Sequence, residues 1–84
     1  MILPTIHRNG TSASALLEQA CGACNAARGL LKALIEAVPN GRDYNLRDGA
    51  FEVARREYEA RAQAARGILD DMEKLAEHCY GELS

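Results

Sequence analysis

The chain has 84 residues, of which 48% are hydrophobic and 5% aromatic, and its formal net charge is −2. A chain of this length builds one hydrophobic core and therefore one domain. The small acidic excess disfavours a general nucleic-acid binder, because such proteins usually present a basic surface to phosphates. No segment approaches the roughly 20 apolar residues of a membrane span, so we expect no membrane contact.

The first half of the chain predicts an extended arm followed by a long helix. Residues 1–10 form the arm, which ends in the Asn9-Gly10 turn signal, and Thr11 is a suitable N-cap for a helix over residues 12–38. Pro39 ends this helix. Its apolar residues recur at alternating spacings of three and four, as in a helix with one buried stripe: Leu17, Ala20, Cys24, Ala27, Leu31, Leu34 and Val38.

The second half predicts a loop over residues 39–47 and a second helix over residues 48–80, which Asn45 or Asp48 could cap. The second stripe has the same spacing: Phe51, Ala54, Tyr58, Arg61, Ala65, Ile68, Met72, Leu75 and Cys79. Because the loop is short, the two helices are expected to pack as antiparallel neighbours. The predicted fold is therefore all-α, an antiparallel two-helix hairpin with an extended N-terminal arm.

Pairing the ends of the two stripes predicts the register of the hairpin. With Val38 opposite Phe51, Leu31 meets Tyr58 and Ala27 faces Arg61. The same pairing places residues 70–84, which carry five acids against one lysine, beside the start of the first helix. A helix N-terminus favours nearby negative charge.

A second regular row on the first helix consists of small residues: Gly22, Ala26, Gly29 and Ala33. Glycine inside a helix costs about 1 kcal/mol relative to alanine, so two at heptad spacing indicate that another helix approaches closely. Self-association is the simplest source of that helix, and we expect an oligomeric helical bundle. The alternative is a solvated face that merely tolerates small residues.

The three cysteines and two histidines do not predict a reaction. Cys21 and Cys24 form a CxxC inside a helix, without the strand that precedes redox motifs and without two further zinc ligands nearby. The N-terminus lacks the basic and apolar regions of a signal peptide, so we expect reduced thiols in a cytoplasmic protein. His7 and His78 have no adjacent nucleophile. We expect no catalysis, no metal and no cofactor.

Arg61 is the one charged residue in the second stripe, and it indicates a ligand site. The predicted register brings Arg28, Lys32 and Tyr58 close to it. Cations beside a tyrosine ring favour a phosphate-bearing ligand with a stackable base. The alternative is that glutamates pair with these cations while the stem of Arg61 covers apolar surface.

Two polar motifs lie at opposite ends of the predicted hairpin. The loop contains Arg42, Asp43 and Tyr44, which combine a guanidinium with an aromatic ring, and the arm contains His7, Arg8 and Asn9. Loops carry function more often than helix faces do. Antiparallel packing of neighbouring subunits would bring the two motifs together. The alternative is that the loop residues only satisfy the backbone of a turn.

The segments Pro4-Thr5-Ile6-His7, Asn9-Gly10-Thr11-Ser12 and Pro39-Asn40-Gly41-Arg42-Asp43-Tyr44 resemble a family of short uncharacterised helical proteins encoded by tailed phages and prophages. The resemblance covers nearly the whole chain, although Asn45 stands where the family pattern has a second aromatic residue. It implies an accessory phage protein in the host cytoplasm, and such proteins often act against host defences.

The resulting hypothesis is a non-enzymatic oligomer that binds and sequesters a small anionic nucleotide signal, such as a cyclic nucleotide, at sites between subunits. This extends the resemblance by analogy with other helical phage proteins. The alternative is a protein–protein interaction module that inhibits a host defence enzyme or acts in phage assembly through its helix faces and acidic end.

Overall fold

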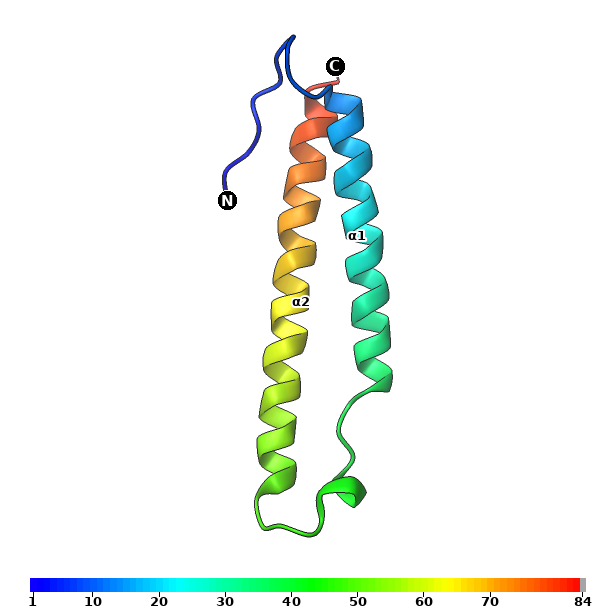
Figure 1. The fold of residues 1–84 in the computed structure, drawn as a ribbon, viewed down its shortest axis with the longest axis vertical. Coiled ribbons are helices and arrows are strands. Elements are labelled where there is room, and N and C mark those ends of the chain that lie inside the picture. The colour runs from blue at the N-terminus through cyan, green and yellow to red at the C-terminus, as the bar shows by residue number, and fades with distance from the viewer. Residues whose placement is uncertain (84) are drawn as a thin grey trace.

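The chain folds into two long antiparallel helices joined by a loop, as the computed structural model of residues 1–83 shows (Figure 1). Helix α1 spans Ala13–Glu36, the short 3-10 helix η1 spans Gly41–Tyr44, and helix α2 spans Ala50–Gly81. These residues include no strand. The predicted all-α hairpin is confirmed. It is a rod with extents of 61 × 20 × 17 Å.

Helix α1 begins and ends inside its predicted bounds. Ser12 is the N-cap, and its side-chain oxygen accepts a hydrogen bond from the Ala15 amide at 3.1 Å, so the predicted cap at Thr11 is wrong. The helix ends with Ala37 as C-cap, and Val38 lies outside it. Proline disfavours helical conformation in the preceding residue, which explains why Val38 cannot continue α1.

Helix α2 begins after a glycine rather than after a side-chain cap. Its N-cap is Gly49, with a φ of 79° in the left-handed region, and no side chain bonds to the helix start there. Glycine adopts this conformation without a steric penalty, so the chain can turn sharply from the loop into α2. The predicted caps at Asn45 and Asp48 are wrong, and α2 starts at Ala50.

Small side chains make the fully buried contact between the helices. The buried residues are Ala13, Ala20, Cys24 and Ala27 from α1 and Ala54, Ala62, Ala65 and Cys79 from α2. The predicted placement of Arg61 and Ile68 in the stripe is wrong, because both are exposed. Alanine at residue 62 takes the inward position instead, which keeps a guanidinium out of an apolar contact where it would have no partner.

The register also differs from the prediction. The Tyr58 hydroxyl donates a 2.7 Å hydrogen bond to the carbonyl oxygen of Leu34, about one turn beyond the predicted Leu31. Arg28 pairs with Glu73 of α2 at 3.8 Å. The prediction failed because it aligned the helices on Val38, which is not helical.

The N-terminal arm runs beside the end of α2 (Figure 1). The His78 ring donates from Nε2 to the carbonyl oxygen of Pro4 at 2.8 Å, which fastens the arm to the helix. The arm covers little beyond that point, since Ile2 is 95% exposed. Neither helix, within residues 1–83, is long and apolar enough to cross a bilayer.

Candidate functional site

One long side of the hairpin is charged. The Arg28–Glu73 pair bridges the helices there, and Arg28 also donates to the Asn25 side chain at 3.3 Å. A hollow of about 240 Å³ at this pair is lined by residues that include Cys21 and Glu77. We call this the charged side of the hairpin.

The opposite long side is apolar. Leu30 is 48% exposed and Ile68 is 54% exposed. Leu30 lies two residues from Arg28, about 200° around α1, and Ile68 lies five residues from Glu73, about 140° around α2 after one full turn. The helix periodicity places further apolar or small residues on this side, which we call the apolar side: Ala26, Ala33, Ala64 and Leu75.

The structure does not bring together the predicted ligand cluster of Arg28, Lys32, Tyr58 and Arg61. Arg28 reaches Glu73, which is twelve residues, or about 18 Å of helical rise, from Arg61 along α2. Arg61 is exposed and points to the same side as Ile68, seven residues away, whereas Lys32 follows Arg28 on the charged side. The Tyr58 hydroxyl already donates its hydrogen bond to the Leu34 carbonyl oxygen. No single-chain site therefore contains these four residues.

Lys32 and Arg61 are nevertheless available to a ligand. Both are exposed, and neither forms an ion pair or a side-chain hydrogen bond within the part of the chain described here. Arg55, in contrast, contacts Glu52 at 3.3 Å and Glu59 at 4.0 Å. Of the cations predicted in the cluster, these two keep their charge uncompensated.

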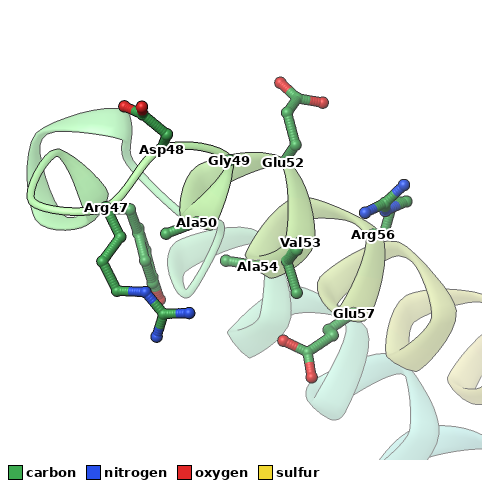
Figure 2. A pocket seen from close by; sticks show the side chains of 10 residues that line it. Arg47, Asp48, Gly49, Ala50, Glu52, Val53, Ala54, Arg56 and Glu57 are labelled. Atoms are coloured by element: carbon green, nitrogen blue, oxygen red, sulfur yellow. The ribbon is translucent and has the colours of Figure 1, made fainter.

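A hollow of about 510 Å³ lies where the loop meets α2 (Figure 2). Its lining is Tyr44, Arg47, Asp48, Gly49, Ala50, Glu52, Val53, Ala54, Arg56 and Glu57. Asp48 and Glu52 point away from the side on which Arg47 and Glu57 lie. Three carboxylates against two guanidinium groups give this lining a net negative charge, which disfavours an anionic ligand.

The other predicted loop residues take part in the turn itself. Arg42 donates from its backbone amide at 2.9 Å and from Nε at 3.2 Å to the side-chain oxygen of Asn40. The Asp43 amide donates to the Asn40 carbonyl at 3.0 Å. Asp43 and Tyr44 also line a hollow of about 220 Å³ beside Leu46, which is 96% exposed. These bonds support the reading of this segment as a structural turn.

The arm motif lies at the other end of the rod. His7, Arg8 and Asn9 are all exposed, and the Gly10 amide closes the turn by donating to the His7 carbonyl at 3.1 Å. Within one chain the length of the hairpin separates this motif from Arg42, Asp43 and Tyr44 (Figure 1). Only another copy could join the two motifs.

The predicted interface row is open in the single chain. Gly22, Ala26, Gly29 and Ala33 are exposed, and a Cβ added at either glycine would meet nothing within 4 Å. Ala26 and Ala33 belong to the apolar side. The sequence reasoning missed Leu30 and Ile68 as centres of this surface. The signal was present for Leu30, which lies beside the stripe of α1, whereas Ile68 was assigned to the stripe of α2 itself.

The cysteines form no metal site within residues 1–83, where no group of three or more His, Cys, Asp or Glu residues could hold a metal ion. Cys24 and Cys79 are buried free thiols and Cys21 is an exposed one. Buried thiols behave as small apolar side chains.

Comparison of the chain with protein families, with curated proteins and with solved structures gave no significant match.

Tyr58→Phe tests the bond that ties α2 to the end of α1. Removing the hydroxyl leaves the Leu34 carbonyl without its side-chain donor, and we expect the free energy of unfolding to fall by about 1 kcal/mol. Urea unfolding followed by circular dichroism measures this change. Tyr44→Phe is the matched control, because no protein group bonds to that hydroxyl among the residues described. Equal effects of the two substitutions would contradict the assignment.

Proposed function

We propose that the chain is a non-catalytic binding protein that acts as an oligomer of hairpins. The observation that carries this proposal is the surface of a single chain, which is 6444 Å². A compact monomer of 9.1 kDa is expected to expose about 4,900 Å². The hairpin alone therefore exposes about 1,500 Å² more than a folded monomer of its mass.

The shape of the chain supports the same proposal. Its radius of gyration is 18.3 Å, whereas about 12 Å is expected for a compact domain of 84 residues. Among residues 1–83, every buried residue is an alanine or a cysteine, while twelve large hydrophobic residues are exposed. Small chains with so little core usually gain their stability from oligomerisation, metals or disulfides.

The ligand we propose is a small anionic nucleotide signal, bound between subunits and sequestered without conversion. Lys32 and Arg61 support this proposal, because both are exposed cations without ion-pair partners in the described chain. Arg61 also points to the apolar side, so a subunit packed there would lie next to it. The chain resembles short phage proteins, which often act against host defences. Sequestering a host nucleotide signal is consistent with such a role.

Isothermal titration calorimetry with cyclic dinucleotides and cyclic trinucleotides tests the ligand class. We expect saturable heat for one of them and at least tenfold weaker binding for Arg61→Gln, because a hydrogen bond to a charged group contributes about 1.5–3 kcal/mol. Arg55→Gln is the matched control, since glutamates already hold that arginine on the same helix. Absence of heat from every nucleotide would exclude this ligand class.

A protein partner is the second candidate, and the acidic end of α2 favours it. Asp70 and Asp71 are exposed and have no ion-pair partner within residues 1–83, whereas Glu73 is held by Arg28. Uncompensated carboxylates at one end of a rod suit a basic surface on another protein. In this role the chain would inhibit a host defence enzyme or guide phage assembly.

The combined substitution Asp70→Lys and Asp71→Lys tests this second candidate. We expect the unaltered protein to capture a stoichiometric partner from host lysate and the doubly substituted protein to capture none. Reversing charges at the edge of an interface replaces attraction with repulsion. Glu36→Lys, at the other end of the hairpin, is the control and should retain the partner. A partner that is captured equally by all three proteins would show that the acidic end is not the contact.

A further inference from the structure

Leu30 and Ile68 lie at the centre of a long surface that no segment within residues 1–83 covers. We infer that the apolar side is the docking surface for a second copy of the chain. The two hairpins pack antiparallel, with the loop end of each beside the chain termini of the other, and together complete a four-helix bundle. This inference rests on the proposed function, because it specifies which partner and which contact make the oligomer.

The area of the uncovered surface fits a second copy. Burying the excess of about 1,500 Å² on each chain would give an interface of about 3,000 Å² in total, which lies in the range of obligate dimers. A rod of 61 × 20 Å can supply that area only if most of one long side takes part. A contact limited to the ends of the hairpin would be too small.

The chemistry of the two long sides selects which one is buried. On the apolar side, Ala26, Ala33 and Ala64 surround Leu30 and Ile68, so two copies can approach closely there, and Arg61 is the cation beside this contact. On the charged side, contact would desolvate the Arg28–Glu73 pair and the unpaired Lys32. Removing charged groups from water is unfavourable unless partners satisfy each of them fully.

The charge distribution selects the antiparallel orientation. Residues 70–84 carry a formal charge of −4, from five acids against one lysine, and lie at the end where α2 finishes. Residues 41–57, at the loop end, carry no net charge, from four arginines against four acids. A parallel pair would place two −4 ends together, whereas an antiparallel pair places each beside the uncharged loop end of its partner. The antiparallel arrangement therefore avoids repulsion between like charges.

Sedimentation velocity on the full chain tests the docking surface with two matched substitutions. Ile68→Lys places a charge on the apolar side, and Ile35→Lys places the same charge on the charged side, where that isoleucine is 69% exposed. We expect the unaltered chain and Ile35→Lys to sediment at twice 9.1 kDa or a higher even multiple. Ile68→Lys should weaken association at least tenfold, so its helical circular dichroism should be lost at a protein concentration at least tenfold higher than for Ile35→Lys.

The orientation is tested by pulsed electron–electron resonance between nitroxide labels at Gly41→Cys, where an added Cβ meets nothing within 4 Å. Cys21→Ser removes the exposed native thiol, and the other two cysteines are buried. An antiparallel pair puts the two labels near opposite ends of the assembly, at a distance approaching the 61 Å length of the rod. A distance close to its 20 Å width would overturn the antiparallel arrangement.

The results separate this inference from the proposed function. If the unaltered chain is an oligomer and Ile68→Lys leaves it intact, the docking surface is wrong and the oligomeric binding protein stands. If the unaltered chain sediments as a single hairpin at high concentration, both are overturned. Dissociation of Ile68→Lys, with an intact Ile35→Lys, supports the apolar side as the contact.

Discussion

The fully buried part of the contact between α1 and α2 is made by alanine and cysteine, and the rest of the structure depends on it. Ala20, Cys24 and Ala65 are among these residues, and their side chains are small. A methyl group buries little apolar area, and burial stabilises by about 25 cal/mol per Å². The buried contact therefore contributes little to the free energy of unfolding of the hairpin. The larger side chains remain only partly covered, and their burial has to come from elsewhere.

This division gives the hairpin two unlike long sides. The Arg28–Glu73 pair and Lys32 keep one side compatible with water, and Leu30 and Ile68 leave the other in need of a partner. The cations predicted to form one ligand cluster are divided between these sides, so the proposed nucleotide site would have to be built from more than one chain. The proposed ligand binding would then depend on assembly, because Arg61 lies beside the apolar side, where a second chain would pack.

Much of the fold could be predicted from the sequence, because helix periodicity and a short connection specify a hairpin. The rotation of α2 could not. Arg61 and Ala62 both satisfy the alternating spacing, and the choice between them depends on the cost of burying a guanidinium against a partner helix. The register failed for a related reason: Val38 continues the pattern but lies outside α1, where Pro39 ends the helix. Periodicity does not show where a stripe stops being helical. The hollow beside Gly49 was equally hidden, since it arises from a non-periodic turn.

A single hairpin has too little core, and we propose that association supplies the missing burial. Thermal unfolding measured by circular dichroism over a hundredfold range of protein concentration tests whether folding depends on association. For an obligate dimer, the linkage between folding and association contributes about 2.7 kcal/mol over that range, so Tm should rise by several degrees as the concentration increases. A Tm that is high and independent of concentration would contradict the account, because it would show that one chain is stable alone.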